Sequence, residues 1–226
     1  MKKYIQISCI LILISQISFA QPNTNKPGSE YKFTITKSIE STPVQAQGKT
    51  GTCWSFSTLS FFESEIMRIK KIKDVKLSEM FVVRKTYPLK AENYVRMHGK
   101  AQFEEGGEPT DVVYCWKNFG MVPREIYNGN LNEANGYNHK AMDSTLLAEV
   151  KTVAIKDKIN PADWKLEVNN TLDTYLGKAP ETFTYIGKEY TPKTYAAELG
   201  INPDDYVFIS SFTHHPFYQT FILEVP

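Results

Sequence analysis

The sequence predicts an α+β protein in which helices dominate the first half and helices mix with short strands in the second. Apolar residues recur with helical periodicity through the first half, whereas apolar and polar residues alternate in short runs near both ends. The chain has 226 residues, of which 42% are hydrophobic, so it can bury one sizeable core or form one domain with an appendage. No internal repeat or low-complexity tract stands out.

The first twenty residues have the composition of a secretory signal peptide. Lys2 and Lys3 form the charged end, and an apolar stretch over 5–19 follows. Ser18 and Ala20 supply the small residues of a cleavage site. The stretch is shorter than the ~20 apolar residues of a membrane span, so a cleaved signal is favoured over an N-terminal anchor. We therefore expect cleavage after Ala20, a secreted or periplasmic protein, and no membrane span in the mature chain.

The first half of the mature chain is predicted to be mainly helical. A flexible leader over 21–30 precedes a short strand in YKFTIT, residues 31–36. Apolar periodicity then predicts helices over 53–72, 77–98 and 110–119. The third helix ends before a glycine, a residue typical of the end of a helix.

Residues from about 140 onward are predicted to begin a second unit with two amphipathic helices. The apolar face of the first is Met142, Leu146, Val150 and Val153. The apolar face of the second is Trp164, Val168, Leu172 and Tyr175. Asn160 and Pro161 are placed as the cap and first-turn residue of this second helix.

A hairpin, a short helix and two strands are predicted to follow. FTYIGKEY, residues 183–190, has the pattern of a hairpin that turns at Gly187-Lys188. Thr191-Pro192 opens a short helix that ends at Gly200. Apolar strands are predicted over 206–212 and 217–225.

Charge and motif content exclude several classes of function. The 26 Lys and Arg residues balance 25 Asp and Glu, so no nucleic-acid partner is expected. The GKT at 48–50 lacks the upstream glycine of a phosphate-binding loop, because Pro43 stands there. No CxxC or HExxH pattern occurs, and His214 and His215 are adjacent, so we expect no metal and no other cofactor.

Cysteine usage leaves one thiol to explain. Cys9 lies in the signal, so the mature chain keeps Cys53 and Cys115, two thiols that an oxidising compartment could pair. Cys115 shares a helical face with apolar neighbours and is interpreted as a small buried residue. Cys53 instead follows Gly51 and Thr52 and opens a long helix-compatible run, CWSFSTLSFFESEIMRIKK.

This position suits a nucleophile. An ordinary thiol ionises near pH 8.5, so only a few per cent is thiolate at neutral pH. A helix N-terminus favours the anion by about 0.3–1 kcal/mol, and a cationic partner must supply the several kcal/mol more that a strongly activated thiolate needs. Gln47 stands six residues before Cys53 across a turn with two glycines. Its amide and the Cys53 N–H are predicted to form an oxyanion hole.

TPVQAQGKTGTCWSFST, residues 42–58, resembles the active-site segment of papain-like cysteine peptidases. By this resemblance Gln47 is the oxyanion glutamine, Cys53 is the nucleophile, and Trp54 packs behind it. Thr50 stands where secreted papain-type enzymes carry a disulfide cysteine, so that bridge is absent. With the lack of a long inhibitory pro-segment, this looks more like the bleomycin hydrolase and aminopeptidase C branch, which suggests exopeptidase action and homo-oligomers.

The resemblance also implies a peptide substrate and residues that hold it. Gly106 and Gly107, in GGEPTDVVYCWKNFGMVPREIY, match the pair whose backbone holds the substrate in an extended pose. Gly51 and Trp54 are assigned to substrate binding with them. The carboxylates of FEEGGE, residues 103–108, either lie on a solvated loop or select a basic or amino-terminal group of the substrate.

The implied fold is papain-like but incomplete. Residues 31–140 correspond to the helical lobe with the nucleophile, and residues 141–226 to a helix and hairpin region that leads to the second lobe. The family needs a histidine and an orienting asparagine downstream of the nucleophile. No asparagine occurs after Asn202, so we expect both catalytic residues to lie beyond Pro226.

The histidines present are interpreted in other ways. His98 is predicted to lie on the surface at the end of a helix, and His139 to be a capping or surface group. His214 and His215 lie at a suitable distance downstream of Cys53. They are disfavoured because His215 is followed by Pro216 rather than by a small residue on a continuing strand.

The sequence thus predicts a cysteine-type peptidase that hydrolyses peptide bonds through a thioester and is inactive or impaired as this chain alone. The alternative is a non-catalytic peptide-binding or assembly remnant that uses the Gly106-Gly107 edge without turnover. A third hypothesis is a thiol-reactive redox protein built on Cys53.

Overall fold

The structure is a computed structural model that describes residues 28–31, 33–131, 136–156 and 160–221. The predicted signal peptide and most of the predicted leader lie outside these residues. The chain divides into two compact units, Met1–Ile39 and Glu40–Pro226. The helices and strands described below belong to the second unit.

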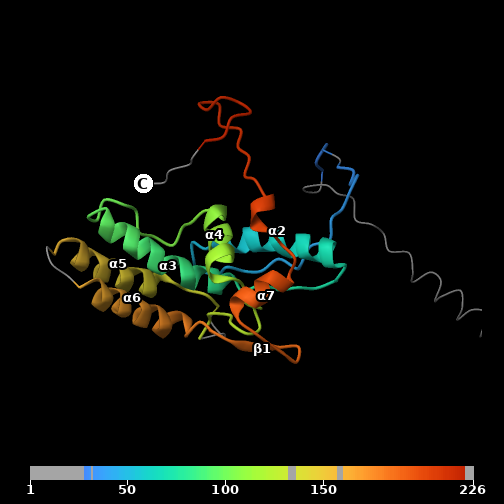
Figure 1. The fold of residues 1–226 in the computed structure, drawn as a ribbon. Helices are drawn as coiled ribbons and strands as arrows, with labels where there is room; N and C mark the ends of the chain where they lie inside the picture. The colour runs from blue at the N-terminus through green and yellow to red at the C-terminus, as the bar shows by residue number, and fades with distance from the viewer. Residues whose placement is uncertain (1–27, 32, 132–135, 157–159, 222–226) are drawn as a thin grey trace, which may run out of the picture. The chain divides into compact units, whose positions relative to one another are not determined.

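A group of helices packed around α3 forms this unit (Figure 1). The helices are α2 (Cys53–Lys70), α3 (Glu79–Arg96), α4 (Pro109–Phe119), α5 (Lys140–Ala154), α6 (Pro161–Leu176), α7 (Pro192–Glu198) and the 3₁₀ turn η2 (Pro203–Asp205). Helix α3 contacts α2, α4, α5 and α6, and α5 and α6 also contact each other. Figure 1 shows α3, α5 and α6 running side by side.

The three helices predicted in the first half are present, with ends set by local capping. Helix α2 stops at Lys70 because Lys71 takes a left-handed conformation with φ 57°. Helix α3 starts after Ser78, whose hydroxyl accepts a hydrogen bond from the Phe81 N–H at 2.9 Å. Helix α4 starts at Pro109, with a capping box formed by Glu108 and Asp111.

The two predicted amphipathic helices are also present, and their apolar faces form part of the core. All four predicted face residues of α5 are buried: Met142, Leu146, Val150 and Val153. On α6 the buried residues are Trp164, Val168, Leu172 and Leu176. Tyr175 is exposed, so the prediction that it belongs to this face is wrong. The Asn160 side chain caps α6 as predicted, because its oxygen accepts from the Ala162 N–H.

A hairpin of β1 (Phe183–Tyr185) and β2 (Lys188–Tyr190) is the sheet of the described residues. Its register pairs Phe183 with Tyr190 and Tyr185 with Lys188. The turn therefore consists of Ile186 and Gly187, both at positive φ, and the prediction of a turn at Gly187-Lys188 is wrong by one residue. Helices joined to one short antiparallel hairpin confirm the predicted α+β class.

The strands predicted over 31–36, 206–212 and 217–225 are not formed in their described parts. Lys32 and residues 222–225 lie outside the described residues. Tyr31, Val207 and Ile209 are exposed, and no described segment pairs with these runs. A strand needs a neighbour for its N–H and C=O groups, so alternating apolar residues alone do not make one.

The core lies where the helices meet around α3. Its largest fully buried side chains include Phe62 of α2, Phe81 of α3, Leu146 of α5 and Leu172 of α6. Within the described residues, no helix combines the length and the apolar character that crossing a membrane requires.

Candidate active site

Cys53 is the first residue of α2, and its side chain is exposed. The main-chain N–H groups of Ser55 and Phe56 already donate to the Thr52 oxygen. No acidic residue lies in the first turn of α2, so the sequence of this turn places no negative charge beside the thiol. The next residue, Trp54, is buried, so an exposed thiol and a core side chain are neighbours in the chain.

Gln47 lies at the start of a tight turn, residues 47–52, here called the nucleophile turn. Its amide Nε2 donates to the Thr50 main-chain oxygen at 2.5 Å, and the Thr50 hydroxyl donates to the Gln47 main-chain oxygen at 2.9 Å. Thr50 and Thr52 share a further hydroxyl–hydroxyl bond at 2.6 Å. A primary amide has two N–H groups, so one remains to donate outside the turn, as an oxyanion hole requires.

The segment before α5 fixes the other side of this turn. The Lys49 N–H donates to the Tyr137 oxygen at 2.8 Å, and Lys49 forms a parallel bridge with Asn138. Gly48 has φ +65°, and a Cβ added there would lie 2.5 Å from the Tyr137 oxygen. Only glycine fits this approach. This contact could not be predicted from sequence, because it joins main-chain groups of residues almost ninety positions apart.

Gly106 and Gly107, here called the glycine strip, lie beside the Trp54 ring. A Cβ on Gly107 would sit 2.7 Å from a ring carbon of Trp54, whereas a Cβ on Gly106 would meet nothing within 4 Å. Gly106 is exposed. One glycine of the pair is thus needed for packing, and the other has no side chain to block the approach of an extended peptide, while its main-chain oxygen accepts from Lys90.

Glu105 connects the glycine strip to the nucleophile turn, a role that the sequence did not predict. Its carboxylate accepts from the Gly51 N–H at 2.5 Å, and its main-chain oxygen accepts from the Trp54 indole N–H at 3.1 Å. The structure therefore brings Gly51, Trp54 and the glycine strip together around the start of α2.

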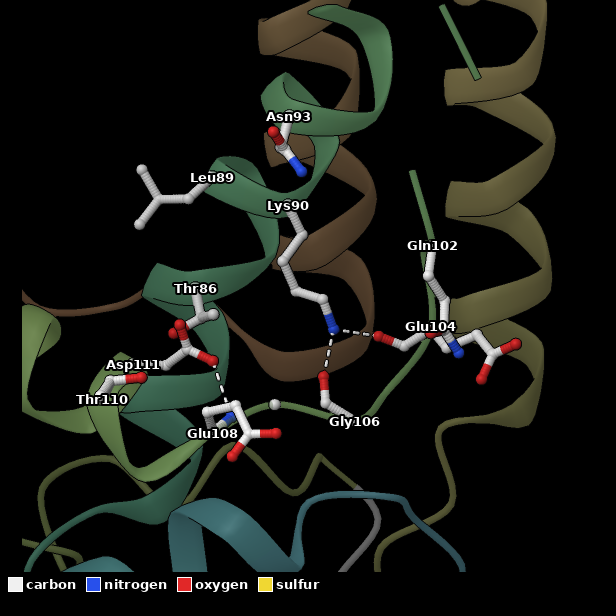
Figure 2. A pocket seen from close by; sticks show the side chains of 11 residues that line it. Thr86, Leu89, Lys90, Asn93, Gln102, Glu104, Gly106, Glu108, Thr110 and Asp111 are labelled. Atoms are coloured by element: carbon white, nitrogen blue, oxygen red, sulfur yellow. Dashed lines mark hydrogen bonds between the residues drawn. The ribbon is translucent and has the colours of Figure 1, made fainter. Parts of the chain in front are cut away.

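A groove of about 530 Å³ runs along the other side of the glycine strip, between it and α3. Figure 2 shows the Lys90 ammonium reaching across to the main-chain oxygens of Glu104 and Gly106. Burial lowers the pKa of Lys90, and neighbouring carboxylates, Asp111 first among them, oppose this effect. The groove walls also carry Glu104 and Glu108, so they are rich in acidic and polar groups.

Two buried carboxylates hold the segment that precedes the nucleophile turn, one directly and one through an arginine. Glu63 of α2 accepts from the Thr42 hydroxyl at 2.5 Å and from the Leu77 N–H at 2.8 Å. Glu79 of α3 pairs with Arg124 at 3.1 Å, and Arg124 also donates to the Gln45 side-chain oxygen at 2.5 Å.

Burial is the largest influence on the pKa values of these two carboxylates. It raises the pKa of Glu79 to about 7 despite the opposing charge of Arg124, and it also raises the pKa of Glu63. Glu79 keeps one buried oxygen without a partner among the described residues.

No imidazole in the described part of the chain is hydrogen-bonded to Cys53. His98 is exposed just after α3, as predicted. His139 occupies the N-cap position of α5, but its ring makes no capping bond and is only 4% exposed, so the prediction of a capping or surface side chain is wrong. The His214 and His215 rings lie 4.2 Å apart between centroids and are tilted by 47° to each other, and His215 stacks on Phe221.

The described residues contain no group of three His, Cys, Asp or Glu side chains able to hold a metal ion. The two described thiols are unpaired and differ sharply in environment. Cys53 is exposed, whereas Cys115 is buried in α4, and burial raises the pKa of its thiol.

Comparison with known proteins shows which family the chain is similar to. Residues 32–140 match the model of the papain family of cysteine proteases. Aminopeptidase C of Streptococcus thermophilus is 24% identical over 214 residues, which cover 80% of this chain and 46% of that protein.

A solved structure has the same fold. The crystal structure of pepw from Lactobacillus rhamnosis HN001 superposes with a TM-score of 0.58 and 22% identity, covering 76% of this chain and 47% of that one. The chain thus spans about half the length of both relatives. These matches confirm the predicted resemblance to papain-like cysteine peptidases of the aminopeptidase C and bleomycin hydrolase branch.

Proposed function

We propose that this chain carries the nucleophile and the peptide-holding strip of a papain-like cysteine peptidase of the aminopeptidase C kind. The observation that carries the proposal is the exposed Cys53 thiol at the start of α2, beside a Trp54 ring that packs on Gly107. A substrate can reach the thiol from solvent, and the adjoining strip offers main-chain groups to an extended peptide.

In the proposed reaction, Cys53 Sγ bonds to the scissile carbonyl carbon, and the carbonyl oxygen takes the negative charge. The remaining Gln47 amide N–H and the Cys53 N–H donate to that oxygen, each contributing about 2.7–4 kcal/mol to the transition state. The C–N bond then breaks, the amine leaves with a proton, and water hydrolyses the thioester. An imidazole supplies this proton in the family, and none of the four histidines of the chain is assigned that role.

Turnover of aminoacyl and blocked-peptide fluorogenic amides by the protein as its native host makes it tests the proposal, since we propose that residues 1–226 alone are inactive or impaired. We expect C53S to lose turnover by about 10³-fold or more, because the nucleophile is removed. The matched variant C115A should keep it, since that thiol is buried away from solvent. Equal turnover by the wild type and C53S would contradict the proposal. Faster cleavage of the unblocked amides would support aminopeptidase over endopeptidase action.

Gln47 offers an independent test of the oxyanion role. Q47A should lower kcat by about 10²–10³-fold, the loss typical of one oxyanion donor. Alkylation of Cys53 by iodoacetamide builds no oxyanion, so its rate should change little. An equal loss in both rates would show that Gln47 acts only by supporting the turn through Thr50.

A second candidate is a peptide-binding protein without turnover. It is favoured by the lack of an imidazole bonded to Cys53 among the described residues and by the groove beside the glycine strip. Calorimetric binding of a non-hydrolysable peptide, without cleavage of its amide counterpart, would support this candidate over the enzyme.

Export is part of the proposal, supported by the pattern of residues 2–20. Amino-terminal sequencing of the protein made in its native host should begin at Gln21. A chain that still begins at Met1 would contradict export by a cleaved signal. Homo-oligomers, proposed from the branch resemblance, are tested by light scattering of the same material.

A further inference from the structure

Glu105 joins two segments that are 54 positions apart in sequence. Its carboxylate Oε2 accepts from the N–H of Gly51, two residues before the nucleophile. Its main-chain oxygen accepts from the indole N–H of Trp54, directly after the nucleophile. One residue at the edge of the glycine strip therefore holds the chain on both sides of Cys53.

The packing around these bonds leaves little space for the strip to move. A Cβ added to Gly51 would lie 2.9 Å from the Glu105 Cβ, and one added to Gly107 would lie 2.7 Å from the Trp54 ring. Real Cβ atoms are not found this close to other heavy atoms. A displacement of the glycine strip would therefore be transmitted to the nucleophile turn.

Helix α3 holds the same segment from its other side. The Lys90 ammonium donates to the main-chain oxygens of Glu104 and Gly106, one on each side of Glu105 (Figure 2). These bonds fix main-chain carbonyls, so they do not depend on the side chains of the segment. The carboxylate of Glu105 is the side chain that ties the strip to the turn.

We propose that Glu105 is a positioning residue that keeps the glycine strip in register with Cys53, so that a bound peptide presents its carbonyl to the thiol. This inference rests on the proposed function. The carboxylate acts as an acceptor for a main-chain N–H, and bonds of this charge-assisted kind are about twice as strong as neutral ones. The half-buried Glu105 carboxylate is thus engaged by the nucleophile turn and is not a freely solvated loop group.

Two reagents separate positioning from reactivity. Iodoacetamide needs only the thiol, whereas a peptidyl chloromethyl ketone also needs the strip. In E105M, which keeps bulk but loses the acceptor, the peptidyl rate should fall about 10–100-fold, because a misplacement of about 1 Å costs this much. The iodoacetamide rate should stay within about threefold of the wild type.

Two further variants serve as a conservative rescue and as a matched control. E105Q keeps an acceptor oxygen, so its ratio of peptidyl to iodoacetamide rate should return to within about threefold of the wild type. E181A removes an exposed glutamate from another loop and should leave the ratio unchanged. An E105M ratio equal to that of the wild type overturns the proposal, and so does an E105Q ratio as low as that of E105M.

Hydrogen exchange of the Gly51 amide, followed by NMR on the full ¹⁵N-labelled chain, provides a readout without activity. The wild type and E105Q should protect this amide, and E105M should lose at least about tenfold of the protection. An equally fast Gly51 amide in all three overturns the proposal. If the wild type does not react faster with the peptidyl reagent than with iodoacetamide, the proposed function fails. The exchange rate of the Gly51 amide then decides by itself whether Glu105 holds the turn.

Discussion

Gly106 and Gly107 are neighbours in the chain, yet only Gly107 is packed against another side chain. We predict that G107A destabilises the fold by about 1–3 kcal/mol, because its methyl group would overlap the Trp54 ring. The matched variant G106A should change stability by less than about 0.5 kcal/mol, since its methyl group points into open space. Urea unfolding of both variants measures the difference. Equal losses would mean that the Trp54 contact is not the cause.

The two described thiols also differ in their exposure to solvent. Cys53 is exposed, while Cys115 is 1% exposed within α4. We predict that iodoacetamide labels Cys53 but not Cys115 in the folded protein, because a buried thiol with a raised pKa neither meets the reagent nor ionises.

Mass spectrometry of the labelled peptides measures this selectivity. Labelling in guanidinium chloride serves as the control and should modify both residues. Modification of Cys115 in the folded chain would show that α4 opens readily.

At the scale of elements, α6 depends on its buried face for its place in the bundle. Leu172 is fully buried, and Leu166 on the same helix is 62% exposed. We predict a loss of about 2–5 kcal/mol for L172A, from burial and the cavity left behind. L166A should cost less than about 0.5 kcal/mol, since Ala is a good helix former. Similar losses measured by thermal unfolding would place the buried face of α6 elsewhere.

The helices could be predicted to within a few residues because their signals are local. Asn160 caps α6, and the apolar period of α5 identifies its buried residues without reference to the rest of the chain. The strands could not be predicted in this way, because a strand exists only where a second segment pairs with it. The hairpin forms since both of its strands are adjacent in sequence, and its turn then falls at Ile186-Gly187.

At the scale of the whole molecule, His139 makes stability depend on pH. Burial lowers its pKa to about 4 in the folded state, below the value near 6.5 of an unfolded histidine. Between these values the unfolded chain binds the extra proton, so stability is complete above about pH 6.5 and falls as the pH drops toward 4. The loss approaches about 3 kcal/mol.

Urea unfolding at several pH values between 4 and 7 checks this prediction. H139F should flatten the curve, because a phenyl ring keeps the contact with Tyr137 and does not titrate. H98N, at an exposed position with positive φ that asparagine tolerates, should leave the curve unchanged. The raised pKa of Glu79 acts in the opposite direction, since that contribution is lost as the pH rises from about 4.5 to about 7. The difference between H139F and the wild type therefore isolates His139, and parallel curves would contradict its role.

The candidate site could be predicted only in part. Gln47, Cys53 and Trp54 stand in one short segment, so the sequence names them together. Glu105 and Tyr137 hold that segment in place, but they act on it through main-chain groups of Gly51 and Lys49. Main-chain groups are the same at every residue, so no pattern of residue types marks these contacts.

The sequence by itself determined where the helices lie, the buried face of α5 and most of that of α6, the cysteine proposed as the nucleophile and the family that this chain resembles, because these depend on local periodicity and on a short motif. Tertiary structure alone decided that Glu105 ties the glycine strip to the nucleophile turn, that His139 is buried, and that the outer apolar runs are not strands in their described parts. Each of these depends on which distant segments meet. A one-dimensional pattern does not contain that information, because burial and pairing are set by the partner as much as by the residue itself.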